Sequence, residues 1–488
     1  MRKAEGAELG MDLEPFFTPR GVVLVGARRS PGFGFILPIA LRRQGWGDRL
    51  FLVNPAGGEL HGMPVHESVA AVPGDPDLAV VIVPAAAVPR VLDEIGERGI
   101  RHVIIESAGF SETGEEGVEL QREAREVAGR WGMRVIGPNC VGVVNTSNRF
   151  STVEVVDEAL CPGPVAVIAQ SGVFGNILLD GLHRKGLFIS KAVTMGNRMD
   201  VNECEVLEYL RRDPDTRVIM MYLEGAANGR LLRETLARVT REKPVLVLKS
   251  GRTQAGRRAT ASHTGSMSGE DDLYEAVFRQ SGAVRARSLE ELVDMARVFS
   301  TQPRPAGNRL GIATSSGSLG TLATDAAVES GLVLPDLDPV SIDKMRAIAP
   351  RWMNVRNPLD VGPSGAFISA ITALAEDPGV DMVLSIAVMP YAVFHEFRER
   401  GVSVRDFLGI ASGLRDKAPG KPLVLCSIGD EGFVRDLDEA VGPGVPVLTS
   451  PERAARALAA LWRYGKTRAE RVWPKRADSS CHDATGVW

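Results

Sequence analysis

Residues 21–35 read GVVLVGARRSPGFGF, an apolar run followed by a glycine-bearing loop and the beginning of a helical pattern. A buried strand that leads into such a loop and a helix presents backbone N–H groups and the positive end of a helix dipole to an anion. The loop glycines let a ligand approach the backbone closely, and Arg28 and Arg29 add positive charge. The stretch therefore predicts the first strand of an α/β domain with a phosphate-binding loop. The same loop could instead serve only to pack a helix against the sheet.

The loop differs from the fingerprint of NAD-binding domains. That fingerprint needs G-x-G-x-x-G, followed by a carboxylate after the second strand to bind the ribose. Here the loop reads GARRSPGFG, and the expected second strand, LFLV at 50–53, ends in Asn54 and Pro55. The sequence disfavours NAD and leaves room for another ligand with a diphosphate, such as coenzyme A.

Short apolar runs alternate with helical patterns over most of the chain. The runs lack a strict period of two, which is typical of strands buried on both faces of a parallel sheet. Strand–helix alternation of this kind indicates doubly wound α/β domains. The nine runs are GVVLVG (21–26), DLAVVIVP (77–84), HVIIES (102–107), PVAVIAQ (164–170), VIMMYLE (218–224), PVLVLKS (244–250), RLGIATS (309–315), MVLSIAV (382–388) and PLVLCSI (422–428).

Two breaks divide this pattern. Polar, irregular sequence at 146–163 and a Pro-containing stretch at 300–308 each precede a new apolar run. The expected domains are 8–145, 163–300 and 308–467, followed by a loose, disordered tail at 471–488.

The composition excludes several classes of protein. The chain has 488 residues, 44% of them hydrophobic, and a net charge of −4, without the basic patch of a nucleic-acid-binding protein. It has no apolar run near the ~18 residues of a membrane span, and its N-terminus does not resemble a signal peptide. Five scattered cysteines form no CxxC pair, so we expect neither a disulfide scaffold nor a metal site. We expect a cytoplasmic protein that binds no nucleic acid and no membrane.

One of the seven histidines, His263, differs from the others in its surroundings. It lies in the loop GRTQAGRRATASHTGSMSGEDD at 251–272, which follows an apolar run containing Lys249. An imidazole among small hydroxyl residues in a cationic loop can accept and donate a phosphoryl group. Composition alone leaves a packed or surface imidazole equally open.

Glu224 ends the neighbouring apolar run and so falls at the same sheet edge as His263. A carboxylate that accepts a hydrogen bond from one ring nitrogen fixes the tautomer of a histidine and makes the other nitrogen more nucleophilic. The alternative is a strand-end glutamate that faces solvent.

Two further strand–turn–helix units have the form of anion sites. One follows the run PVAVIAQ and continues into Ser171 and Gly172, and the other follows RLGIATS and continues into Ser316 and Gly317. Both would present free N–H groups and a positive dipole end to a phosphate. Each unit alone is a weak signal, whereas together with His263 they make a coherent phosphate site.

Over residues 16 to 465, the chain resembles the alpha subunit of ADP-forming (NDP-forming) acetate–CoA ligases, which are relatives of succinyl-CoA synthetase. The segments that carry the resemblance are GVVLVGARRSPG, FLVNP, DLAVVIVPAAAVP, SAGFSETGEEG, IGPNCVGVVNT, IAQSGVFGN, GNRMDVNECEVLEYL, YLEGAANGR, LKSGRTQAGRRATASHTGSMSG and ATDAAVESGL.

The resemblance implies a Rossmann-like CoA-binding domain followed by two flavodoxin-like domains. It implies that His263, in the SHTGS motif, is phosphorylated and that Glu224, in YLEG, is its hydrogen-bonded partner. The residues implied to bind CoA are Gly26, Ala27, Arg28, Pro31, Gly34, Asn54, Pro55, Val83, Pro84, Ala85, Ser107, Ala108 and Gly109. Those implied to face the acyl and phosphate groups are Asn139, Cys140, Gln170, Ser171, Gly172, Ser316 and Gly317.

The chain departs from the family pattern at two places. Where the family typically reads NPK after the second strand, this chain has Asn54, Pro55 and Ala56, which removes a cation near CoA. Where the family usually has a Gly-Gly-Pro turn, this chain reads SSGSLG at 315–320, which keeps backbone donors but puts the loop shape and turnover in doubt.

The resemblance implies a reaction in three steps. Phosphate attacks an acyl-CoA, the resulting acyl phosphate phosphorylates His263, and the phosphoryl group passes to ADP or another NDP. The chain has no G-x-x-x-x-G-K-[ST] loop. No ATP-grasp module is recognised either, and in the family that the chain resembles this module can be a separate beta subunit. The resemblance therefore implies an ATP-grasp beta subunit that holds ADP or ATP with Mg, while this chain handles coenzyme A, phosphate and a small carboxylic acid.

Two other functions compete with this interpretation. The chain could be a non-catalytic, CoA-binding regulatory protein, which the altered 315–320 loop favours and the retained His263 and Glu224 disfavour. A serine hydrolase built on Ser171 would need G-x-S-x-G, and the sequence AQSGV lacks both outer glycines.

Overall fold

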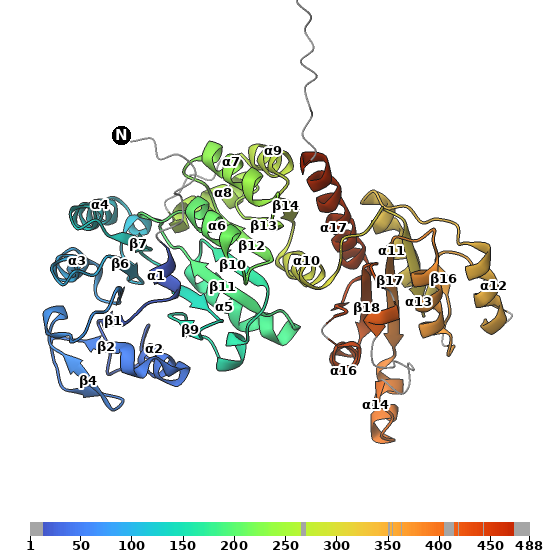
Figure 1. Cartoon of the computed structure of the whole chain (residues 1–488), viewed down its shortest axis with the longest axis horizontal. Coiled ribbons are helices and arrows are strands. Elements are labelled where there is room, and N and C mark those ends of the chain that lie inside the picture. Colours follow the sequence, from blue (N-terminus) through green and yellow to red (C-terminus); the bar gives the residue numbers. More distant parts are fainter. Residues whose placement is uncertain are drawn as a thin grey trace, which may run out of the picture.

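The computed structural model describes residues 13–264, 270–349, 352–353, 355–362, 364–404, 414–417, 419–442 and 444–472. Figure 1 shows three α/β units that follow one another along the long axis of the molecule, in the order of the sequence. Each of the nine predicted apolar runs contains a strand, and the predicted α/β class is confirmed. Residues 473–488 of the predicted tail lie outside the described residues.

The first unit is built on a seven-stranded sheet with the order β3-β4-β2-β1-β5-β6-β7. β1 pairs in parallel with β2 on one side and with β5 on the other, so the order of the strands reverses beside β1. Open α/β sheets bind ligands outside the carboxyl ends of the strands at such a switch point. The strands are β1 (Val22–Val25), β2 (Leu50–Val53), β3 (Glu59–Leu60), β4 (Met63–His66), β5 (Leu78–Val81), β6 (His102–Ile105) and β7 (Arg134–Ile136).

The second unit has the order β14-β13-β12-β10-β11-β8-β9, in which β11, β10, β12, β13 and β14 form a parallel flavodoxin-like core. Its switch point lies at β10. The strands are β8 (Gly142–Asn145), β9 (Phe150–Ser151), β10 (Val165–Ala169), β11 (Ile189–Thr194), β12 (Val218–Leu223), β13 (Val245–Lys249) and β14 (Val284–Ala286).

The segment after the first sheet belongs to the second sheet. β8 pairs antiparallel with β11, and β9 pairs antiparallel with β8. The domain boundary expected at residue 145 therefore falls at the end of a strand of the second sheet, and the expected linker at 146–163 contains β9.

The third unit has five parallel strands in the order β16-β15-β17-β18-β19. Its strands are β15 (Leu310–Thr314), β16 (Leu359–Asp360), β17 (Met382–Met389), β18 (Leu423–Gly429) and β19 (Val447–Leu448). The apolar residues of these runs are almost all buried, which explains why the runs lack the alternation of a half-exposed strand.

The sheets are covered by amphipathic helices. Among those described, no helix is both long and apolar enough to span a bilayer. The helices are α1 (Glu14–Phe17), α2 (Leu37–Leu41), α3 (Val88–Glu97), α4 (Glu115–Arg130), α5 (Gly172–Leu182), α6 (Glu203–Arg212), α7 (Gly229–Val239), α8 (Gln254–Thr264), α9 (Asp271–Ser281), α10 (Leu289–Thr301), α11 (Gly317–Glu329), α12 (Pro339–Ile348), α13 (Phe367–Glu376), α14 (Tyr391–Glu399), α16 (Glu431–Val441) and α17 (Pro451–Val472).

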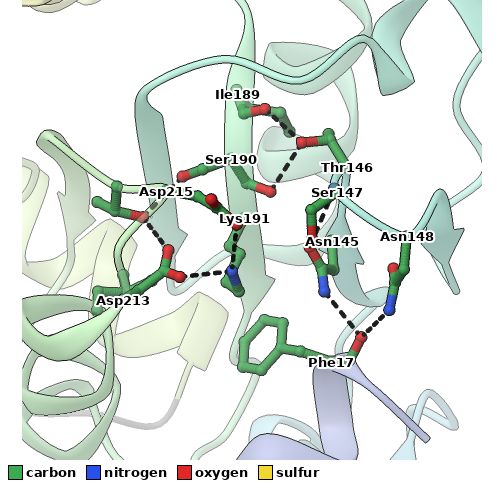
Figure 2. Close-up of polar contacts among 12 residues, drawn as sticks. Phe17, Asn145, Thr146, Ser147, Asn148, Ile189, Ser190, Lys191, Asp213 and Asp215 are labelled. Carbon is green, nitrogen blue, oxygen red and sulfur yellow. Dashed lines mark hydrogen bonds and ion pairs between the residues drawn. The ribbon is translucent and has the colours of Figure 1, made fainter.

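Polar contacts fasten the chain between the first two sheets. The side-chain amides of Asn145 and Asn148 donate to the carbonyl oxygen of Phe17 at 3.1 and 2.9 Å, which ties α1 to the end of β8 (Figure 2). In the same view, Lys191 of β11 donates to the carboxylate of Asp213 at 2.7 Å, and both side chains are buried. The contacts of Asn145 and Asn148 hold α1 of the first unit against the second sheet. The Lys191–Asp213 pair braces β11 within the second unit.

Candidate active site

A cavity of about 1210 Å³ lies at the carboxyl edge of the first sheet and continues to the second sheet. It exceeds the roughly 300–1,000 Å³ of most small-molecule pockets, so it suits an extended ligand. Thirteen of the predicted site residues line it: Gly26, Arg28, Asn54, Pro55, Val83, Pro84, Ser107, Ala108, Asn139, Cys140, Gln170, Ser171 and Gly172. The cavity thus brings the predicted CoA loop and one predicted phosphate site into one space.

Five other predicted residues belong to the same loops but do not line the cavity. They are Ala27, Pro31, Gly34, Ala85 and Gly109.

The loop after β1 is fixed by its backbone. Gly26 adopts a φ of 97°, and a Cβ there would collide with the carbonyl oxygen of Ile82, so the position requires glycine. The side-chain amide of Asn54 donates to the carbonyl oxygen of Ala27 at 3.0 Å, which anchors the loop on the end of β2. Arg28 remains exposed in the cavity wall, where it can meet the negative charge of a ligand.

The floor of the cavity is built from the ends of β5 and β6. The hydroxyl of Ser107 accepts a hydrogen bond from the N–H of Val83 at 3.1 Å and so joins the two strand ends. The N–H of Asn139 donates to the carbonyl oxygen of Ser107 at 2.9 Å. Asn139 has a φ of 60°, in the left-handed region that asparagine tolerates better than most residues.

Cys140 is a buried thiol rather than a nucleophile. Its Sγ donates to the carbonyl oxygen of Ile105 at 3.3 Å. Burial, and then the nearby Glu106, raise the pKa of Cys140 well above its ordinary value. The thiol therefore stays neutral at physiological pH, and reactive cysteines are usually thiolates in electropositive sites.

Gln170 connects the end of β10 to the end of β12. Its amide oxygen accepts from the N–H groups of Glu224 and Gly225 at 2.6 and 3.1 Å, and its amide nitrogen donates to the carbonyl oxygen of Gly225 at 2.8 Å. Glu224, which is 2% exposed, is thereby held directly beside the cavity wall. The role of the Gln170 amide is to position the backbone that carries Glu224.

The N-terminus of α5 faces the cavity through Ser171 and Gly172. Ser171 is the N-cap residue, with extended backbone, and its side chain forms no capping hydrogen bond. The first N–H groups of a helix have no intrahelical partner, and the helix dipole gives that end a partial positive charge. This end of the cavity is therefore suited to an anion such as phosphate.

A buried lysine stands where the predicted phosphorylation loop leaves β13. Lys249 is 2% exposed, and its Nζ lies 4.6 Å from the ring centroid of Tyr274. Burial lowers the pKa of Lys249 to about 8, while the carboxylates of Asp271 and Glu224 favour its charged form. The sequence predicted a loop around His263, but the residue falls instead in the last turn of α8, and its side chain lies outside the part of the chain that the structure describes.

The remaining predicted phosphate residues, Ser316 and Gly317, begin α11 in the third unit and do not line the cavity. A Cβ on Gly317 would lie 2.6 Å from a carboxylate oxygen of Asp360, so a negative charge already stands beside this helix end. Within the described residues, no three His, Cys, Asp or Glu side chains are grouped so that they could hold a metal ion.

Two family models match the chain. A CoA binding domain covers residues 20–146, and a succinyl-CoA ligase like flavodoxin domain covers residues 162–299. The chain is 35% identical to the alpha subunit of acetate–CoA ligase [ADP-forming] I of Pyrococcus furiosus, over 94% of this chain and 99% of that protein. The chain belongs to the family of ADP-forming acetate–CoA ligases.

Other members of this ligase family show the same relationship. The chain is 36% identical to acetate–CoA ligase [ADP-forming] II of Archaeoglobus fulgidus, over 94% of this chain and 68% of that protein. The fold matches that of the dinucleotide forming acetyl-coenzyme A synthetase 1 of Candidatus Korarchaeum cryptofilum, solved with phosphate and ADP. The TM-score is 0.84, at 30% identity, over 94% of this chain and 98% of that one. The chain is thus an acid–thiol ligase, and a catalytic role is favoured over a regulatory one.

Several cavity residues of the ligase were not predicted from the sequence. They are Phe33, Glu67, Ser68, Ala87, Arg90, Val91, Glu94, Glu106, Val141, Gly196 and Asn197, together with apolar residues at the strand ends. Arg90 and Glu94 form an i,i+4 ion pair on α3, a spacing that the sequence already contained. Glu106 closes the apolar run of β6, and a carboxylate inside such a run is the signal that could have found it.

Proposed function

We propose that this chain is the CoA-handling subunit of an NDP-forming acyl-CoA synthetase, which interconverts an acyl-CoA and phosphate with a carboxylic acid, CoA and an NTP. One observation carries the proposal: the glycine loop at Gly26 and the N-terminus of α5 open into the same cavity. An extended ligand with a diphosphate at one end and a thioester at the other can therefore contact both.

The first chemical step takes place at the α5 end of the cavity, where the thioester meets the phosphate. Phosphate held at the α5 N-terminus attacks the thioester carbonyl carbon, the C–S bond breaks, and an acyl phosphate and CoA are formed. The N–H groups of Gly172 and the following residues, with the helix dipole, stabilise the phosphate and the charge that develops on it.

In the second step, an imidazole nitrogen of His263 attacks the phosphorus, and the carboxylate leaves. Glu224, which lies at the carboxyl end of β12 beside the cavity wall, is the acceptor that we expect to hold the other imidazole nitrogen. A loop that carries the phosphoryl group between sites would explain why the nucleotide site need not lie in this chain.

The third step transfers the phosphoryl group to a nucleoside diphosphate on a partner. The relative from Archaeoglobus fulgidus extends well beyond this chain, whereas the Pyrococcus furiosus relative of matching length is named an alpha subunit. We infer an ATP-grasp beta subunit that binds the nucleotide with Mg. We expect the complex to work in the cytoplasm, where reducing conditions keep cysteines as thiols.

The test is a labelling experiment. The purified chain is incubated with radiolabelled phosphate and a panel of acyl-CoAs, beside a His263→Ala variant. We expect protein-bound label that survives base, is lost in acid, depends on one class of acyl-CoA, and is absent from the variant.

Two other outcomes would contradict the proposal. Label that persists in His263→Ala would assign the phosphoryl group to another residue. A protein that binds CoA but gains no label with any thioester, even after a beta subunit is added, would favour the regulatory alternative.

A further inference from the structure

Glu106 is a buried carboxyl group in the wall of the cavity. It directly follows β6, lines the cavity, and is 5% exposed. Its Oε1 atom has no hydrogen-bond partner among the described residues. A polar group that is buried without a partner costs about 1–3 kcal/mol, so a functional reason for its presence is needed.

The surroundings of Glu106 favour its uncharged form. The titratable group that acts on it is Glu154, which follows β9, and Glu106 in turn acts on the thiol of Cys140. Burial, and then the charge of Glu154, raise the pKa of Glu106 well above its ordinary value, and the pKa of Glu154 is also raised by burial. A protonated carboxyl in a cleft is a group that can donate a proton at neutral pH.

Glu106 also stands near the reacting end of the cavity. It precedes Ser107, whose hydroxyl joins the ends of β5 and β6, and it adjoins Cys140. The backbone of Cys140 lies only 3.5 Å from a Cβ built on Gly172, the first residue of α5. A ligand that runs from the Gly26 loop to the α5 N-terminus therefore passes beside Glu106.

The first step of the proposed reaction needs a proton donor at this place. When phosphate attacks the thioester, the electron pair of the C–S bond goes to sulfur and forms a thiolate. Because an ordinary thiol has a pKa of about 8.5, this thiolate takes up a proton at neutral pH. We propose that Glu106 protonates the CoA sulfur as the thioester breaks, and that its carboxylate takes the thiol proton in the direction of thioester synthesis. This inference rests on the proposed function.

The step balances without another reactant. Hydrogen phosphate loses its proton when its oxygen becomes acylated, and that proton restores the carboxyl of Glu106. The products are an acyl phosphate and the neutral thiol of CoA, and no oxidation or reduction occurs.

The experiment separates this step from the next one. Wild type and Glu106→Gln are labelled in two ways: with radiolabelled phosphate plus acyl-CoA, which needs the C–S bond to break, and with radiolabelled acyl phosphate, which needs only His263. We expect Glu106→Gln to lose roughly 10²–10⁴-fold in the first rate, the range of general acid catalysis, and to keep the second. Retained labelling from acyl phosphate also demonstrates that the variant is folded.

The pH dependence gives a second readout. Because Glu106 acts in its protonated form, the wild-type rate of labelling from acyl-CoA should fall as pH rises through the pKa of this carboxyl, and Glu106→Gln should lack that limb. Glu97→Gln, which removes an exposed carboxylate at the end of α3, is the matched control and should behave as wild type in both assays.

Two outcomes would overturn the proposal. One is an unchanged rate and pH profile from acyl-CoA in Glu106→Gln. The other is an equal loss of both labelling reactions, which would give Glu106 a structural role. If wild type itself gains label from neither donor, the proposed function fails first, and the two failures are thus distinguishable.

Discussion

Lys249 shows how burial of a single residue controls pH dependence. Burial lowers the pKa of its ammonium group to about 8 from 10.5. Between these values the unfolded chain binds the proton and the folded chain does not, so Lys249 makes the free energy of unfolding rise with pH. We predict that Lys249→Met removes this rise between pH 8 and 10.5. Denaturant unfolding of both proteins at several pH values measures it, and equal pH slopes would contradict the prediction.

At the scale of single residues, it was easier to predict from the sequence a residue that acts through its backbone than a residue that acts through its side chain. Gly26 was predicted because a glycine in this loop lets a ligand approach the backbone closely, and the structure gives it a φ of 97°. Glu106 was missed because its burial in the cavity wall, beside Cys140 and Glu154, depends on residues that are remote in sequence. The role of His263 rests on resemblance and stays a prediction, since its side chain lies outside the described residues.

The helix α5 contributes to the site through the backbone N–H groups at its N-terminus. Proline is tolerated at the first helical position, and the extended backbone of Ser171 is compatible with a following proline. Gly172→Pro therefore keeps the helix but removes one donor. We predict that the KM for phosphate in labelling from acyl-CoA rises about 10- to 100-fold, equivalent to a charged hydrogen bond of about 1.5–3 kcal/mol, while CoA affinity is kept.

The control for this prediction lies at the other end of the same helix. A Cβ added at Gly181 meets nothing within 4 Å, so Gly181→Ala should leave the KM for phosphate unchanged. An unchanged KM in Gly172→Pro would mean that phosphate binds elsewhere.

Strands could be predicted where many apolar residues follow one another in the sequence. All nine long runs contain strands, because burial on both faces demands a continuous apolar sequence. The two-residue strand β9 has no such signal, and β8 looks like the end of the first domain until its pairing with β11 is seen. Antiparallel additions at a sheet edge depend on partners far away in sequence, which a local pattern does not reveal.

At the scale of the whole molecule, the three units share apolar cores. One core joins residues of the first and second sheets, including Leu24 and Met221, and another joins the second and third, including Val167 and Leu384. In Figure 1, α17 lies between α10 of the second unit and the helices of the third. Two of the cores therefore cross the domain boundaries expected from the sequence, whereas a further core lies within the third unit alone.

This continuity predicts the behaviour of a core mutant in α17. Leu458 is 0% exposed in the core that joins the second and third sheets. Leu458→Ala should lower the free energy of unfolding by about 2–5 kcal/mol, and it should lower the melting temperature of the second and third units together. Calorimetry measures the transition, with Leu322→Ala as the control, because that leucine of α11 is 44% exposed and its loss should change stability by less than about 0.5 kcal/mol. If instead only part of the unfolding enthalpy moves to lower temperature in Leu458→Ala, the second and third units unfold independently, and the shared core does not couple them.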